Sequence, residues 1–260
     1  MKWLRTWLAP GLARGTPTEA SPPPSVGDRR VYAIGDVHGR ANLLDALLIL
    51  IARDDAERGA MPPHIVLLGD LVDRGPSSRQ VIDRVMAMVA SGGDVRCLKG
   101  NHEEIFVLAA RGEVRAVPVF RRMEGAATLA SYGLDPILFH VMTDEEIVAW
   151  MLNHVPREHI DFLDALPDQV EMDDYLFVHA GIRPGVPIEA QNGADLRWIR
   201  REFLDHGGAH PKMIVHGHSI TDDVDLQPNR IGIDTGAYYS GRLTAIGLQG
   251  TDRWFLQTND

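Results

Sequence analysis

Short apolar runs recur along the chain, and a polar cluster follows each of them. Runs of about four residues rich in Val, Ile and Leu are typical of strands that are buried on both faces. Each run therefore predicts a strand whose carboxyl end carries polar side chains. The five runs are VYAI (31–34), IVLL (65–68), VRCL (95–98), YLFV (175–178) and MIV (213–215).

The apolar residues between the first three runs recur at helical spacing instead. The series within residues 43–51 and 81–89 predict amphipathic helices. Strand, helix and strand in succession predict βαβ units and a mixed α/β fold with a parallel or mixed sheet. Residues 104–170 are mainly helical in pattern, which predicts a helical insert beside the sheet. Two later runs, 231–234 and 243–248, flank turn-type residues and predict a hairpin.

The first 28 residues have a different character from the rest of the chain. A short stretch with two tryptophans, MKWLRTWLAP, precedes a segment rich in Pro, Gly and Ser. Such a composition buries too little apolar surface to order itself, so we predict a mobile tail over residues 1–28 and one domain over residues 29–260. A short amphipathic anchor for a membrane surface or a partner is the alternative for the first ten residues.

Composition and charge narrow the classes of protein. The net charge of −10 argues against a nucleic-acid partner, which a basic surface would bind. No apolar run approaches the roughly 20 residues of a membrane span, so we expect no stable membrane insertion. The single cysteine, Cys97, excludes an internal disulfide and fits a reducing, cytoplasmic location. The oligomeric state cannot be deduced from the sequence.

The polar clusters contain side chains that bind metals. In an open α/β sheet, ligands lie in the crevice outside the carboxyl ends of the strands, so these clusters should meet in space. Carboxylates, imidazoles and one carboxamide form a ligand set for Mn, Fe or Zn. More candidates converge than the roughly four that one ion needs, which favours two ions and metal-assisted attack of water on phosphorus. The candidates are Asp36, His38, Asp70, Asn101, His102, His179, His216 and His218.

Five motifs that contain all of these residues except His216 resemble those of the calcineurin-like metallophosphoesterases. They are GDVHG (35–39), GDLVDRG (69–75), GNHE (100–103), HAG (179–181) and GHS (217–219). The second motif is most similar to the phosphoprotein phosphatase branch, and residues 233–246 are similar to the closing segment of small bacterial and phage serine/threonine phosphatases. The resemblance covers residues 30 to about 250, except 104–170. It implies a four-layer α/β/β/α sandwich.

The resemblance implies a role for each matching residue. Asp36, His38 and Asp70 would hold the first of two divalent ions, with Asp70 bridging to the second. Mn²⁺ is the ion we expect, with Fe or Zn as alternatives. The ligand set of the second ion would be completed by Asn101, His179 and His218.

The remaining roles concern the substrate. His102 would act as the general acid, oriented by Asp73, and Arg74 would bind the phosphate. Arg200 fits a second phosphate-binding arginine. Lys99 stands before GNHE, where relatives carry Arg, and would contact phosphate without the bidentate grip of a guanidinium.

Three further residues each have two interpretations. His216, two residues before His218, is either a support for the metal ligands or a packed histidine. Arg121 and Arg122 indicate a helix surface that could border a substrate groove.

These inferences favour a dinuclear-metal phosphoester hydrolase, with a serine/threonine protein phosphatase as the first expectation. The substrate would be a phosphoprotein or a phosphorylated small molecule. A dinucleoside tetraphosphate hydrolase is the alternative within the same class, because its motifs overlap with these. A non-catalytic metal- or phosphate-binding module is the alternative from another class, and a nuclease is the weakest because of the charge.

Overall fold

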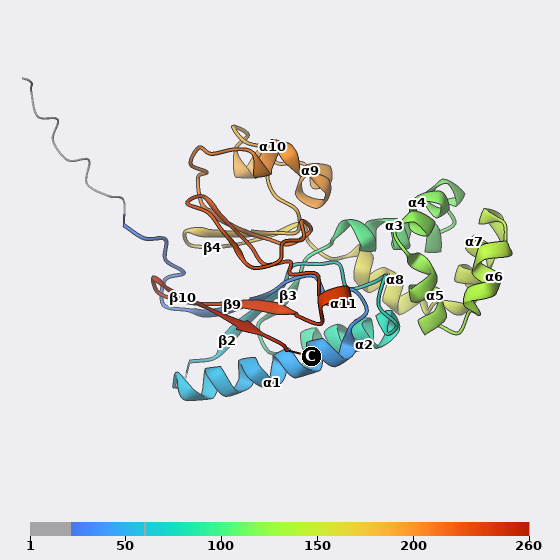
Figure 1. The fold of residues 1–260 in the computed structure, drawn as a ribbon, viewed down its shortest axis with the longest axis horizontal. Coiled ribbons are helices and arrows are strands. Elements are labelled where there is room, and N and C mark those ends of the chain that lie inside the picture. The colour runs from blue at the N-terminus through green and yellow to red at the C-terminus, as the bar shows by residue number, and fades with distance from the viewer. Residues whose placement is uncertain (1–21, 60, 260) are drawn as a thin grey trace, which may run out of the picture.

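The computed structural model describes residues 22–59 and 61–259 and confirms the four-layer α/β/β/α sandwich (Figure 1). The first sheet has the order β10-β9-β1-β2-β3, and the second has the order β4-β5-β6-β8-β7. The strands of the first sheet are β1 (Arg30–Ile34), β2 (Pro63–Leu67), β3 (Val95–Cys97), β9 (Thr244–Gln249) and β10 (Asp252–Gln257). The strands of the second are β4 (Gln169–Met172), β5 (Tyr175–Val178), β6 (Met213–His216), β7 (Asp225–Leu226) and β8 (Arg230–Gly232).

The sheets are buried on both faces, as the continuous apolar runs predict. In β1, Val31 and Ala33 belong to the core between the two sheets, whereas Tyr32 and Ile34 belong to the core under the helices. Side chains alternate between the faces of a strand, so a strand covered on both sides has to be apolar at every position. Parallel pairing of β1 with β2, and of β5 with β6, places several strand ends at one edge.

Helices form the two outer layers (Figure 1). The first sheet is covered by α1 (Ala41–Glu57) and α2 (Ser78–Ala90), whose buried leucines, valines and isoleucines contact the core. The second is covered by α9 (Gly193–Trp198) and α10 (Arg201–Leu204), through Leu196 and Phe203.

The predicted helical insert is confirmed and packs beside the sandwich (Figure 1). Phe106, Phe120 and Phe139 form its centre, with ring centroids about 6 Å apart. Arg121 ties it together by donating to the carbonyls of Phe139 and Met142, both at 2.6 Å. Its elements are α3 (Asn101–Ala110), a 3₁₀ turn (Val114–Ala116), α4 (Val117–Arg122), α5 (Gly125–Ser131), α6 (Pro136–Val141), α7 (Asp144–His154) and α8 (Arg157–Asp164).

The predicted hairpin between residues 231–234 and 243–248 is wrong. These runs become β8 and β9, which lie in different sheets, and the segment with α11 (Ala237–Ser240) carries the chain between them. The hairpin of the structure joins β9 to β10, with Gly250 in the turn at a φ of 54°. Alternation of apolar residues is the same in either sheet, so the pattern could not choose the partner strand.

Most of the predicted tail, residues 1–21, lies outside the described residues, and with it the proposed anchor. Packing begins before residue 28, because Val26 is fully buried and its N–H donates to the carbonyl of Gly250 at 3.0 Å. Among the described residues, no helix is both long enough and apolar enough to cross a membrane.

Candidate metal centre

The strand ends bring the predicted ligands together in strained backbone. Five of the predicted site residues have φ between 45° and 71°, in the left-handed region. Non-glycine residues there cost on the order of 1–3 kcal/mol each, and they persist where the surrounding structure over-determines them. These five are His38, Asp70, Asp73, Arg74 and His218.

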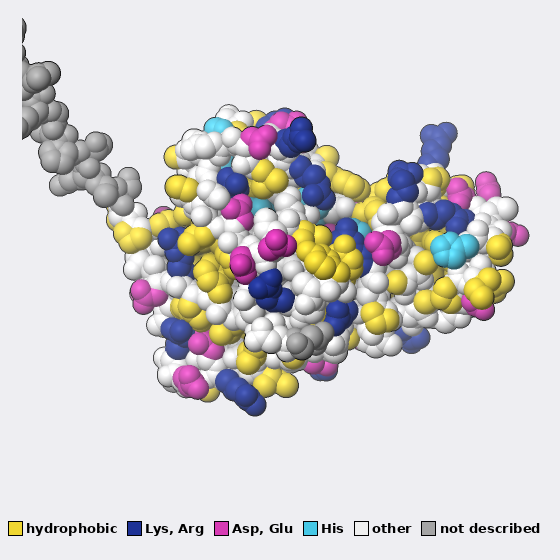
Figure 2. Space-filling view, in the orientation of Figure 1, with side chains coloured by type: hydrophobic (Ala, Val, Ile, Leu, Met, Phe, Trp, Pro, Cys, Tyr) yellow, Lys and Arg dark blue, Asp and Glu magenta, His cyan; other side chains and the backbone are white. Residues whose placement is uncertain are grey.

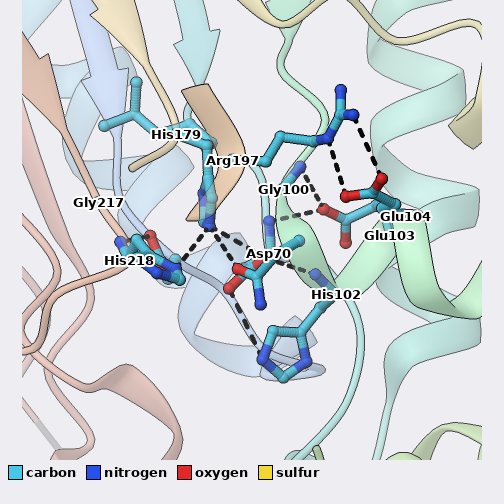
Figure 3. Close-up of polar contacts among 12 residues, drawn as sticks. Asp70, Gly100, His102, Glu103, Glu104, His179, Arg197, Gly217 and His218 are labelled. Atoms are coloured by element: carbon cyan, nitrogen blue, oxygen red, sulfur yellow. Dashed lines mark hydrogen bonds and ion pairs between the residues drawn. The ribbon is translucent and has the colours of Figure 1, made fainter. Parts of the chain in front are cut away.

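Two groups of possible ligands share Asp70. His38, Asp70 and His102 form one group, and Asp70, His179 and His218 form the other, each with its ligand atoms within 4.8 Å of one another. Asp70 therefore occupies the position expected of a bridging carboxylate. Figure 3 shows Asp70 between His102 on one side and His179 and His218 on the other.

The second group fits a cation because two oxygen acceptors face a ring nitrogen of His179 there. His179 donates from Nδ1 to the carbonyl of Leu68 at 2.8 Å, and burial lowers its pKa, so its Nε2 presents a lone pair. That atom lies 2.9 Å from Asn101 Oδ1, 3.2 Å from His218 Nδ1 and 3.4 Å from Asp70 Oδ1. Facing acceptors repel unless a positive ion lies among them. A carboxylate, a carboxamide and two neutral imidazoles form a donor set that suits a divalent ion.

The first group already has a positive charge beside it, the guanidinium of Arg74. His38 Nδ1 donates to the carbonyl of Val72 at 2.8 Å, and burial lowers the pKa of His38 well below its ordinary value. Its Nε2 lies 3.5 Å from Asp70 Oδ2 and accepts from Arg74 Nη1 at 3.1 Å. The Arg74 guanidinium, stacked 4.7 Å above the Tyr238 ring, would have to release His38 for an ion to bind that nitrogen.

Asp36 lies outside both groups, next to Asp234, an aspartate to which the sequence analysis assigned no role. The carboxylate of Asp36 accepts the backbone N–H of His218 at 3.0 Å. Burial raises the pKa of Asp36 well above its ordinary value, and the carboxylates of Asp234 and Asp70 add to this. Burial also raises the pKa of Asp234 to about 6. Asp234 directly follows the apolar run 231–233, and this position at a strand end is the sequence signal that could have identified it as a site residue. Clustered carboxylates are a further feature that a cation would stabilise.

His102 and Asp73 form a hydrogen-bonded pair beside the metal groups. His102 Nδ1 lies 2.7 Å from Asp73 Oδ2, and Nε2 lies 3.8 Å from Asp70 Oδ2. Burial works to lower the pKa of His102, but the carboxylates of Asp70 and Asp73 outweigh it and raise that pKa. The imidazole is thereby favoured as a proton donor near neutral pH.

Thr128 and Glu103 also support the site, and sequence reasoning assigned no role to either. The Thr128 hydroxyl, from the insert, donates to Asp73 Oδ1 at 2.6 Å. The buried carboxylate of Glu103 accepts the N–H groups of Asp70 at 2.8 Å and Gly100 at 2.9 Å (Figure 3). Gly100 has to be glycine because a Cβ there would lie 2.1 Å from Asp70 Oδ1. The GNHE motif signalled Glu103, whereas nothing local signalled Thr128.

A cavity of about 330 Å³ opens onto these residues. Asp70, Asn101, His102 and His218 line it, together with Arg74. Trp198 and Arg200 contribute from α9 and the residues after it, and Arg122, Met123 and Glu124 contribute from the α4–α5 corner. Figure 2 shows the surface hollowed between the part that carries α9 and α10 and the helical insert, with Lys and Arg side chains on both sides.

The structure does not bring Lys99 to the cavity. Its ammonium donates to the backbone carbonyl of Asp164 at 2.6 Å and pairs with that residue's carboxylate at 3.1 Å. The expected contact with substrate phosphate is corrected accordingly: Lys99 links the end of β3 to α8. Arg200, in contrast, lies at the cavity as expected. His216 is a packed histidine, 1% exposed, whose ring meets the edge of Phe203 at 5.1 Å.

The fold agrees with comparisons to known proteins. The sequence matches the family described as calcineurin-like phosphoesterase over residues 29–242. The chain therefore belongs to the calcineurin-like phosphoesterases, a family of metal-dependent hydrolases.

Among curated relatives, the chain is similar to enzymes named for dinucleoside tetraphosphates. It is 26% identical over 235 residues to the asymmetrical bis(5'-nucleosyl)-tetraphosphatase PrpE of Anoxybacillus flavithermus, covering 82% of this chain and 88% of that protein. It is 32% identical over 160 residues to the symmetrical bis(5'-nucleosyl)-tetraphosphatase of Yersinia enterocolitica, covering 61% of this chain and 44% of that protein.

Solved structures support the fold alone. A chain proposed to be a diadenosine tetraphosphatase superimposes with a TM-score of 0.62 at 20% identity, covering 90% of this chain and 96% of that one. A serine/threonine phosphatase from Saccharomyces cerevisiae gives a TM-score of 0.50 at 13% identity, covering 90% and 80%.

Proposed function

We propose that this chain hydrolyses phosphoanhydride bonds of dinucleoside polyphosphates. The observation that carries the proposal is the cavity over the two ligand groups, which three arginines line in a protein of net charge −10. Similarity to the PrpE tetraphosphatases over 82% of the chain supports this substrate. It corresponds to the sequence-based alternative, and it replaces the protein phosphatase as the first candidate.

The site residues divide the work of such a hydrolysis. Two divalent ions, Mn²⁺ in our proposal, would be held by Asp36, His38, Asp70, Asn101, His179 and His218, and when bound they supply Lewis acidity and an activated water. Arg74 and Arg200 bind oxygens of the reacting phosphate. His102 donates a proton to the leaving oxygen as the P–O bond breaks, and Asp73 keeps its ring oriented.

A serine/threonine protein phosphatase is the second candidate. The specific observation in its favour is the GDLVDRG motif, which places Asp73 and Arg74 as that branch has them. The same proton donor would serve a seryl or threonyl leaving group. A cytoplasmic location remains a proposal for either enzyme, and the buried thiol of Cys97 fits it.

One experiment separates the candidates. The purified chain with added Mn²⁺ is assayed side by side on diadenosine tetraphosphate, a phosphoserine peptide and p-nitrophenyl phosphate. We expect the highest kcat/KM with the dinucleotide. A preference for the peptide would overturn the proposal in favour of the second candidate. Metal binding without turnover of any substrate would indicate a non-catalytic module.

A further inference from the structure

Two adjacent arginines at the end of α4 have opposite environments. Arg121 points into the insert, where it pairs with Asp144 at 3.0 Å and donates to two backbone carbonyls. Arg122 is exposed and lines the cavity, and within residues 22–59 and 61–259 no carboxylate pairs with it. Arg121 is therefore structural, whereas the guanidinium of Arg122 is available to a ligand in the cavity.

The corner that carries Arg122 is held in a fixed conformation. Glu124 has a φ of 63°, a left-handed conformation that is costly for a residue with a side chain. Phe120 packs directly over Gly125, where an added Cβ would lie 2.3 Å from the ring. A corner that is fixed by packing needs no backbone rearrangement to present Arg122 to the cavity, so binding orders only the side chain.

The number of positive groups exceeds what one phosphate requires. The reacting phosphate would meet the metal ions, Arg74 and Arg200. Arg200 lines the cavity together with Asp70 and His218, at the two ligand groups. Arg122 is an additional guanidinium, contributed by the insert. Glu124 brings one negative charge to the same rim.

We propose that Arg122 binds phosphate groups of the substrate other than the one that reacts. It is then a specificity residue: a guanidinium makes bidentate, charge-assisted hydrogen bonds to phosphate oxygens, and a monoester offers no second phosphate. The inference rests on the proposed function in naming a polyphosphate chain as the substrate class. It assigns to the helical insert the recognition of that chain.

The test compares ligands with one and several phosphates in Arg122→Ala. Hydrolysis of p-nitrophenyl phosphate is inhibited by inorganic tripolyphosphate or by orthophosphate at a fixed free Mn²⁺ concentration. We expect the inhibition constant of tripolyphosphate to rise about tenfold or more in the variant, and that of orthophosphate to change little. The kcat/KM for diadenosine tetraphosphate should fall by a similar factor, and by more than the kcat/KM for p-nitrophenyl phosphate.

The matched control is Arg115→Ala. Arg115 is also an exposed arginine of the insert, and it does not line the cavity. Arg115→Ala removes the same charge. An equal effect in both variants would indicate that only the net charge of the protein matters, and it would overturn the proposal. Equal losses with both inhibitors, or no loss with either, would also overturn it.

The substrate assignment and the Arg122 assignment fail separately. If the wild type hydrolyses p-nitrophenyl phosphate and not diadenosine tetraphosphate, the proposed function fails, while the inhibition constants still decide the role of Arg122. If no substrate turns over, calorimetric binding of the same two ligands to wild type and Arg122→Ala decides it.

Discussion

The hydroxyl of Thr128 donates a hydrogen bond to the carboxylate of Asp73 at 2.6 Å, although the two residues are 55 positions apart. The backbone N–H of Asp73 donates to the same hydroxyl oxygen at 2.8 Å. Both residues are fully buried. Asp73 in turn holds Nδ1 of His102, so α5 supports the proposed proton donor on α3 through the side chain of Thr128.

Replacing Thr128 by valine should therefore impair proton donation more than phosphate binding. We expect kcat to fall about tenfold for phenyl phosphate, whose leaving group needs a proton, and less for p-nitrophenyl phosphate. Thr128→Ser keeps the hydroxyl and should restore most of the rate. Equal losses on the two esters, or no rescue by serine, would assign Thr128 a purely structural role.

His102→Asn should keep the metal ions and lose most of the turnover. General acids contribute about a hundredfold to ten-thousandfold to rate, and the six side chains proposed to hold the ions are untouched by this change. Steady-state kinetics together with elemental analysis of the metal content check both halves of the prediction. Unchanged turnover would remove His102 from the mechanism.

Asp70→Asn should lower both metal content and activity, because Asp70 is the residue shared by the two ligand groups. An amide has half the oxygen ligands and no negative charge to offset two cations. Elemental analysis should show well below the roughly two ions per chain expected of a dinuclear site. Asp252→Asn, an exposed carboxylate on β10, is the matched control. A variant that retains both ions would refute the bridging role.

Glu103→Gln should destabilise the fold. Glu103 Oε1 accepts the N–H groups of Leu71 and Val72, at 2.7 and 3.3 Å, and Oε2 accepts those of Asp70 and Gly100. A glutamine turns a donor toward one of these pairs, and each buried N–H left without an acceptor costs about 1–3 kcal/mol.

Urea unfolding with and without Mn²⁺ measures this effect. The midpoint of Glu103→Gln should fall in both conditions, which separates loss of the hydrogen bonds from loss of metal. Glu145→Gln, an exposed glutamate on α7, should unfold close to wild type. An unchanged midpoint for Glu103→Gln would show that the hydrogen bonds to its carboxylate do not contribute measurably to stability.

Much of the fold could be predicted because its signals are local. Apolar runs identified the strands that carry the site, and helical spacing identified the insert, since both depend on the period of neighbouring side chains. The choice of partner strand is not local. The sequence pattern therefore predicted a hairpin of β8 and β9, which lie in different sheets. Glu103 and Asp234 stood inside recognisable motifs, but their contacts with Asp70 and Asp36 depend on packing.

By itself, the sequence determined the chemistry available to the protein: carboxylates, imidazoles and one carboxamide at the ends of buried strands. The tertiary structure decided which other side chains reach them. It brought Thr128 to Asp73 and Arg122 to the cavity, and it directed Lys99 to Asp164 instead of toward substrate. The physical reason is that strand-end chemistry follows from residue type and local period, whereas contacts between the insert and the sheets depend on how buried surfaces pack.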